Sequence, residues 1–214
     1  LTEYVEDEDL RRFLRTLGRA NFAGMSVTRP VLEPARIHPA IDQRIRELHR
    51  DLIDEVGRDA TRFFLVARAP SSQLTFDIDL ALSQSNDNPV YYIQYAHARS
   101  CSVMRKLAEL GWEWLAQSAL QHLDQLQEEH EKSLLRQLDR YPEVVAGAAL
   151  NCEPHLVAAY LRELAGDFHT WYNAHKMLVE EQAVRDARVA LSQATGQVIA
   201  NGLELLGVSA PEVM

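Results

Sequence analysis

Apolar residues recur every three or four positions along most of the chain, which is the pattern of helices that bury one face. The first two stripes run over residues 10–17 and 41–53 and end at Gly18 and Gly57. Residues 23–39 hold three prolines and few periodic apolar positions, which predicts a loop between these helices. Pro39 can occupy the first turn of the second helix.

The same periodicity continues to the carboxyl end of the chain. It predicts an extended entry into a short helix near residue 78, and further helices over about 59–67, 89–110, 112–127, 129–139, 141–151, 153–177 and 181–206. Ser85–Pro89 places capping residues before a proline, which indicates a domain boundary and the start of a long helix. Gly207 is expected to end the last helix. We therefore predict an all-α fold, a helical bundle preceded by a smaller helical segment.

Composition narrows the class of protein. The 214 residues have a net charge of −9, which argues against binding nucleic acid through a large basic surface. RNA could then be bound only locally, by bases stacked on aromatic side chains and by a few arginines and lysines at phosphates. Two cysteines without close spacing indicate a reducing compartment and no disulfide framework. The acidic start resembles no signal peptide, and no apolar run is long enough for a membrane span. We expect a cytoplasmic protein that binds neither membrane nor DNA.

The most informative stretch is Asn88–Arg99. On a helix, Tyr92, Tyr95 and Arg99 share one face over two turns. Two phenol rings and a guanidinium suit single-stranded RNA, because rings stack on unpaired bases and arginine binds phosphate or a Hoogsteen edge. Core packing is the competing interpretation: both tyrosines would be core aromatics, and Arg99 would pair with a carboxylate.

A second aromatic ridge lies at residues 168–176. Trp171 is most simply a core residue, whereas Tyr172, Asn173 and Lys176 form a polar-edged side that could meet RNA. A metal site at His169 and His175 is rejected, because six residues separate them and no further ligand completes a tetrahedron.

Motifs for catalysis are absent from the sequence. No phosphate-binding loop, dinucleotide-binding fingerprint or nucleophile elbow occurs. Asp77 and Asp79 lack a partner that would make an acid–base pair. We predict no catalytic, cofactor-binding or metal-binding residues in this chain.

Several of these stretches, in this order, resemble the C-terminal region of arginyl-tRNA synthetases. The similar segments cover about residues 50–214 and include 51–64, 74–81, 88–99, 141–145, 160–172 and 197–208. The resemblance divides the chain into an N-terminal helical segment of unknown role (1–49), a connector like the end of the catalytic core (50–87) and an anticodon-binding-like helical bundle (88–214).

What the resemblance implies is recognition of the tRNA anticodon arm, with tRNA-Arg as the expected partner. Together with the helix faces above, it implies tRNA-binding roles for Tyr92, Tyr95, Arg99, Tyr172, Asn173, Lys176 and the terminal Met214. Lys176 stands where the family carries an aromatic residue. The family's His-x-Gly-His and Lys-Met-Ser-Lys sequences for ATP are missing, so nothing in this chain is expected to activate arginine.

Three functions remain open at this point. The first is a tRNA-binding module that is not itself catalytic. The second is part of an arginine–tRNA ligase whose catalytic half, with its ATP site, lies outside this chain or on a partner chain. The third is a protein-interaction scaffold that has lost RNA binding, which the acidic balance favours.

Overall fold

The computed structural model describes residues 39–69 and 72–214. These residues fall into two units that divide after Gly57. The division lies inside the connector predicted for residues 50–87. The predicted helix at 10–17 and the predicted loop before Pro39 lie outside the described residues. None of the helices in the described ranges is both long and apolar enough to cross a membrane.

The described part of the first unit is one amphipathic helix, α2 (Pro39–Val56), which starts at the predicted proline. Gly57 ends it with a left-handed φ of 86°, a conformation that costs glycine little. Its amide donates to the Ile53 carbonyl at 3.0 Å. Ile45, Leu48 and Ile53 are exposed on this helix.

The second unit is helical wherever it has regular secondary structure in the described residues. Its elements are α3 (Arg58–Val66), α4 (Ile78–Leu82), α5 (Pro89–Glu109), α6 (Ala116–Leu120), the 3₁₀ helix η1 (Leu123–Gln125), α7 (Glu129–Asn151), α8 (His155–Ala174) and α9 (Gln182–Leu206). The predicted all-α fold is therefore confirmed.

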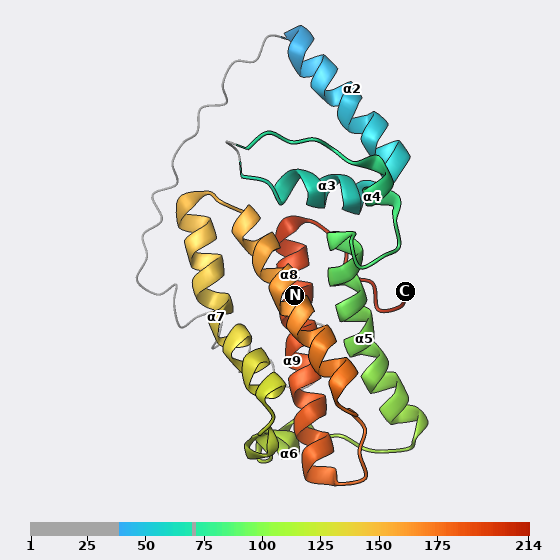
Figure 1. Cartoon of the computed structure of the whole chain (residues 1–214), viewed down its shortest axis with the longest axis vertical. Coiled ribbons are helices and arrows are strands. Elements are labelled where there is room, and N and C mark those ends of the chain that lie inside the picture. Colours follow the sequence, from blue (N-terminus) through green and yellow to red (C-terminus); the bar gives the residue numbers. More distant parts are fainter. Residues whose placement is uncertain (1–38, 70–71) are drawn as a thin grey trace. The chain divides into compact units, whose positions relative to one another are not determined.

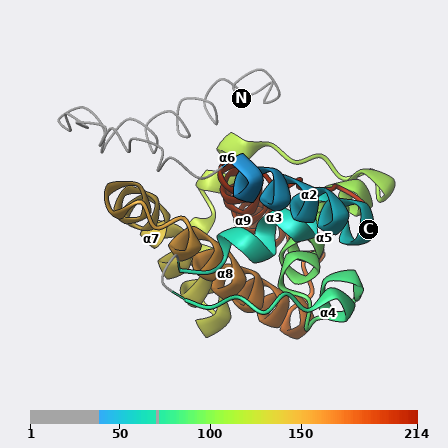
Figure 2. The same cartoon turned by 90° about the horizontal axis from the view of Figure 1, so that it is seen from above.

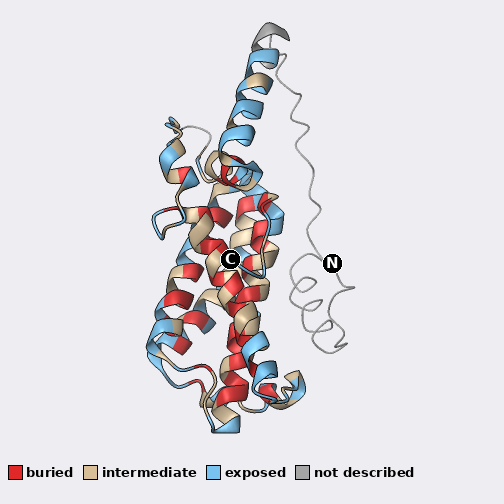
Figure 3. Ribbon diagram, turned by 90° about the vertical axis from the view of Figure 1, so that its right-hand side faces the viewer, coloured by how far each residue is buried: buried red, intermediate tan, exposed pale blue. Residues whose placement is uncertain are grey.

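Helices α8 and α9 pack on each other in the middle of this unit, and α5 and α7 flank them (Figures 1 and 2). Buried residues run along the facing sides of these helices (Figure 3). Phe168 and Trp171 of α8 are fully buried, as are Ile199 and Leu203 of α9. Burying such large side chains contributes roughly 1.5–3 kcal/mol each and stabilises the bundle.

Close approach of α5 to α9 depends on Gly196. A Cβ at this position would lie 2.9 Å from the Cβ of Ser100, which is too near for an ordinary contact. The hydroxyl of Ser100 in turn donates to the Ser192 carbonyl at 2.8 Å. This contact fixes the position of α5 relative to the centre of the bundle.

Two predicted boundaries are wrong. A helix was predicted over residues 112–127, but these residues form only the short α6 and η1. Contacts with α9 hold the residues before α6 out of a helix. Trp114 donates its indole N–H to the Asp186 carbonyl at 3.2 Å, and the Arg185 guanidinium lies 4.1 Å from the centre of the Trp112 ring.

The second wrong boundary lies near Pro142, which does not divide two helices but lies inside α7. Tyr160 of α8 donates its hydroxyl to the Gln137 carbonyl at 2.8 Å, just over one turn before this proline. Packing against α8 therefore holds α7 just before the turn in which proline removes a backbone donor.

Candidate nucleic-acid interface

The register of α5 is set at its first turn. Asn88 is the N-cap: its Oδ1 accepts from the amide of Val90 at 3.2 Å, while its Nδ2 donates to the carbonyls of Ser83 and Ala81 at 2.8 and 3.1 Å. Pro89 follows in the first turn, where its missing N–H costs nothing. This cap fixes which side chains α5 turns toward α8.

Arg99 is the centre of the α5–α8 face. Its guanidinium carbon lies 4.5 Å from the ring centre of Tyr95 and 4.9 Å from that of Tyr172, so it contacts two aromatic rings. Its Nη1 donates to Nδ1 of His169 at 3.1 Å and to Oδ1 of Asn173 at 3.2 Å. We name Tyr92, Tyr95, Arg99, His169, Tyr172 and Asn173 the arginine cluster.

The arginine cluster joins most of the residues predicted from sequence. Tyr92, Tyr95, Arg99 and Tyr172 are half-buried and Asn173 is exposed. Within the described residues no carboxylate pairs with Arg99, since both of its hydrogen-bond partners are neutral. The competing interpretation had Tyr92 and Tyr95 in the core and Arg99 paired with a carboxylate. Both tyrosines are half-buried, and the carboxylate partner is not found among the described residues.

His169 was missed as a member of the site. Its ring centre lies 4.5 Å from Tyr92 and 5.6 Å from Tyr95, and its Nε2 lies 3.1 Å from the Tyr92 carbonyl. Burial lowers the pKa of His169, and the positive charge of Arg99 lowers it further, while the bond to the Tyr92 carbonyl opposes both. The signal in the sequence was its four-residue spacing from Asn173, which places the two on one helix face.

Much of the ring surface in the cluster is already engaged within the protein. Arg99 covers Tyr95 and Tyr172, Tyr91 stacks on Tyr95 at 6.0 Å, and Phe168 lies 5.9 Å from Tyr172. Simple stacking of bases on bare tyrosine faces, as the sequence suggested, is therefore limited here. What Arg99 still offers is its remaining N–H groups, because both of its hydrogen bonds leave from Nη1.

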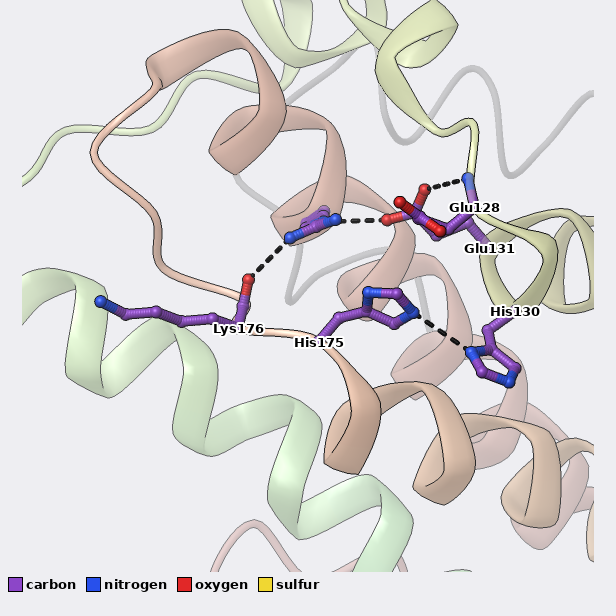
Figure 4. Close-up of polar contacts among 6 residues, drawn as sticks. Glu128, His130, Glu131, His175 and Lys176 are labelled. Atoms are coloured by element: carbon purple, nitrogen blue, oxygen red, sulfur yellow. Dashed lines mark hydrogen bonds and ion pairs between the residues drawn. The ribbon is translucent and has the colours of Figure 1, made fainter.

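Lys176 lies off the helix on which it was predicted. Helix α8 ends at Ala174, and His175 is extended with φ −127° and ψ 141°. The Lys176 carbonyl accepts from Nη1 of Arg188 at 2.9 Å, and its side chain extends away from this bond (Figure 4). Within the described residues its ammonium has no hydrogen-bond or ion-pair partner, so it remains a free cation.

The junction that holds Lys176 contains a buried ion pair. Arg188 donates from Nε to Oε1 of Glu131 at 2.8 Å, and the other carboxylate oxygen accepts from the Glu128 amide at 3.0 Å (Figure 4). Glu131 is fully buried. We name these residues, with the Lys176 carbonyl, the α7–α9 junction.

Among the described residues, Met214 makes no hydrogen bond or ring contact with the arginine cluster. The C-terminal tail bonds along another stripe of α5: its carbonyls at Ser209, Pro211 and Glu212 accept from Gln94, His97 and Arg105 at 3.0, 2.9 and 3.0 Å. At roughly 100° per residue this stripe lies about 150° around the helix from that of Arg99. Met214 itself is exposed.

Within the described residues no three His, Cys, Asp or Glu side chains gather to hold a metal ion. His169 faces the arginine cluster, and Nε2 of His175 lies 3.1 Å from Nδ1 of His130 (Figure 4). The arginine cluster thus brings together a guanidinium, an imidazole, an amide and phenol rings.

Comparison with known proteins finds a family model that matches more than half of the chain. Residues 93–214 match the model of the DALR anticodon binding domain. Curated arginine–tRNA ligases of Legionella pneumophila (strain Corby) and Thioalkalivibrio sulfidiphilus are 54% and 58% identical to this chain over 165 residues, which is 77% of this chain. The matched region is 28% of each ligase, so the chain spans under a third of these relatives.

Solved structures agree with these matches. A putative arginyl-tRNA synthetase from Campylobacter jejuni is similar with a TM-score of 0.67 and 28% identity, over 77% of this chain and 35% of that one. The Thermus thermophilus arginyl-tRNA synthetase is similar with a TM-score of 0.63 and 31% identity, over 81% and 32%. The chain therefore belongs to the DALR anticodon binding domain family and matches the C-terminal region of arginyl-tRNA synthetases.

Proposed function

We propose that the chain binds the anticodon arm of tRNA-Arg through the arginine cluster and is not catalytic by itself. The observation that carries this proposal is Arg99, a half-exposed guanidinium held by two tyrosine rings and two neutral acceptors. Its positive charge has no carboxylate to neutralise it among the described residues. A cation arranged in this way suits an anionic ligand.

The geometry of Arg99 also suggests how it meets RNA. Both hydrogen bonds of the guanidinium leave from Nη1, so Nε and Nη2 remain for an incoming group. Two parallel N–H donors match a phosphate or the O6 and N7 acceptors of guanine. The rings of Tyr95 and Tyr172 keep the guanidinium plane in place, which lowers the entropy cost when RNA binds.

The other predicted residues have supporting roles in this proposal. Asn173 orients Arg99, the Tyr172 ring covers one face of the guanidinium, and the Tyr92 ring packs against His169. Lys176 adds a free positive charge close to the end of α8. Met214 would contact tRNA only from the other side of α5, as a separate part of the interface.

Fluorescence anisotropy at low salt, with tRNA-Arg and an unrelated tRNA, tests the proposal. Arg99→Ala should weaken binding of tRNA-Arg by about 1.5–3 kcal/mol, as for a lost hydrogen bond to a charged group. Tyr92→Ala and Tyr172→Ala should weaken it less, because these rings hold His169 and Arg99 in place. Arg136→Ala is the matched control, because this exposed arginine lies on α7 and already pairs with Glu129. No binding of tRNA-Arg at low salt would contradict the proposal and favour the scaffold that has lost RNA binding.

A second proposal is that the chain is part of an arginine–tRNA ligase. The 54–58% identity to such ligases over 77% of this chain favours it. The ATP-binding and arginine-activating parts would then lie outside these residues. Arginine-dependent ATP–pyrophosphate exchange separates the possibilities: the isolated chain should show none, and exchange by the chain alone would contradict our assignment of a purely RNA-binding role.

A further inference from the structure

His169 has a single hydrogen-bonding arrangement that satisfies its neighbours. A guanidinium only donates, so Nδ1 of His169 must accept from Arg99 and cannot carry a proton. Nε2 faces the Tyr92 carbonyl at 3.1 Å, which only accepts, so the ring proton lies on Nε2. The surroundings therefore select the neutral ring with its proton on Nε2.

We infer that His169 is a positioning residue for RNA recognition: in its neutral form it holds Arg99 in place, and protonation of His169 releases Arg99 and weakens RNA binding. This inference rests on the proposed function of the arginine cluster. Protonation would put an N–H on Nδ1, facing the Nη1 donor 3.1 Å away. Two donors and two positive charges would then oppose each other, and the guanidinium would move off Tyr95 and Tyr172.

The charged groups around the ring support the sign of this effect. Arg99 of α5 is the charged side chain that acts on His169; Tyr92, Tyr95 and Asn173 are neutral. Among the described residues of α3, α7 and α9, which also pack on α8, no acidic or basic side chain offsets this repulsion. Only 6% of His169 is exposed, so water cannot easily screen it.

Bulk electrostatics predicts the opposite pH dependence. Protonating histidines makes an acidic protein less negative and should strengthen binding to RNA as the pH falls. A weakening that depends on His169 is therefore specific to the arrangement described here.

Two substitutions separate the two hydrogen bonds of the ring. His169→Asn keeps an acceptor near Nδ1 for Arg99 but does not titrate. His169→Gln keeps a donor near Nε2 for the Tyr92 carbonyl and has no acceptor at the position of Nδ1, which faces Arg99. His122→Asn, a half-buried histidine at the N-cap of η1, is the matched control.

The test is the dissociation constant for tRNA-Arg at pH 7.5 and pH 5.5. On acidification the wild type should lose more affinity than His169→Asn, with about tenfold as the upper limit for a histidine over this pH range. His122→Asn should follow the wild type, and His169→Gln should bind more weakly at both pH values. Equal pH dependence in the wild type and His169→Asn would overturn the inference.

Nitrogen NMR of the imidazole in the RNA-free chain needs no variant. It should show a neutral His169 with its proton on Nε2 at pH 7.5; a proton on Nδ1 at that pH would overturn the inference. Absence of RNA binding by the wild type at every pH would contradict the proposed function, and the NMR result alone would then decide the position of the proton.

Discussion

Two arginines in this molecule stand at the centre of hydrogen-bond networks, and they differ in what neutralises them. Arg188 of the α7–α9 junction is nearly buried and pairs with a fully buried Glu131 at 2.8 Å. Arg99 of the arginine cluster is half-buried, and its partners are two neutral acceptors and two aromatic rings. The charge of Arg188 is thus neutralised within the fold, whereas that of Arg99 has no carboxylate partner among the described residues.

This difference separates an arginine that stabilises the fold from one that is available for the proposed binding of RNA. A buried, paired charge stabilises a particular arrangement, because removing its partner leaves an uncompensated charge. A guanidinium between rings is held in place without being neutralised. The substitutions below should therefore separate folding from RNA binding.

The largest effect on stability is expected at the α7–α9 junction. Glu131→Gln would leave Arg188 charged, nearly buried and without a carboxylate, which should lower the free energy of unfolding by about 3–5 kcal/mol. Urea denaturation measures this decrease. Glu129→Gln, on the exposed pair with Arg136, is the control and should leave the midpoint unchanged. Equal stability of Glu131→Gln and wild type would refute the structural role of the pair.

Arg99→Lys should separate charge from shape. Lysine keeps the positive charge but lacks the planar guanidinium, so it cannot donate two parallel hydrogen bonds or stack between the Tyr95 and Tyr172 rings. We expect roughly tenfold weaker tRNA-Arg binding, about 1.4 kcal/mol, and a free energy of unfolding within about 1 kcal/mol of wild type. Anisotropy and urea denaturation measure the two quantities. Affinity equal to wild type would show that charge alone suffices.

Tyr172→Leu should have a smaller effect, because Tyr95 still covers one face of Arg99. Removing one cation–π interaction at a half-exposed site corresponds to about 0.5–1 kcal/mol, or a few-fold in affinity. Tyr172→Phe keeps the ring and serves as the matched variant. If Tyr172→Phe weakened binding as much as Tyr172→Leu, the hydroxyl rather than the ring would be responsible.

The smallest predicted effect is the contribution of His169 to stability as a function of pH. Because its folded-state pKa is lowered from 6.5, the folded chain binds fewer protons than the unfolded chain between the two values. This contribution is fully present above pH 6.5 and is lost as the pH falls through the folded-state pKa. In thermal melts, the melting temperature of His169→Asn should fall less on acidification than that of the wild type. An equal decrease in both proteins would exclude this contribution of His169.

Local chemistry made much of the fold and part of the site predictable from sequence. The Asn88 cap, the following proline and the helical period together determine that Tyr92, Tyr95 and Arg99 share a face. That α8 supplies Tyr172 and Asn173 to the same place depends on how α5 packs against it, and for this the resemblance to a known family was needed.

Other features depend on contacts distant in sequence. Trp112 and Trp114 are held out of a helix by Arg185 and Asp186, some 70 residues later. The carbonyl of Gln137, near Pro142, has its partner on α8. His169 joins the cluster through the Tyr92 carbonyl and Arg99 rather than through any motif. Periodicity along one helix contains no information on such pairings.

The central claim is that Arg99 uses its unneutralised charge to bind RNA, and the salt dependence of tRNA-Arg binding tests it most directly. Removing one arginine–phosphate interaction should reduce the slope of log affinity against log salt by about 0.7–0.9. Arg99→Ala should show this reduction together with weaker binding, and Arg136→Ala should match the wild type. An unchanged slope and affinity for Arg99→Ala, or the same decreases for Arg136→Ala, would contradict the account.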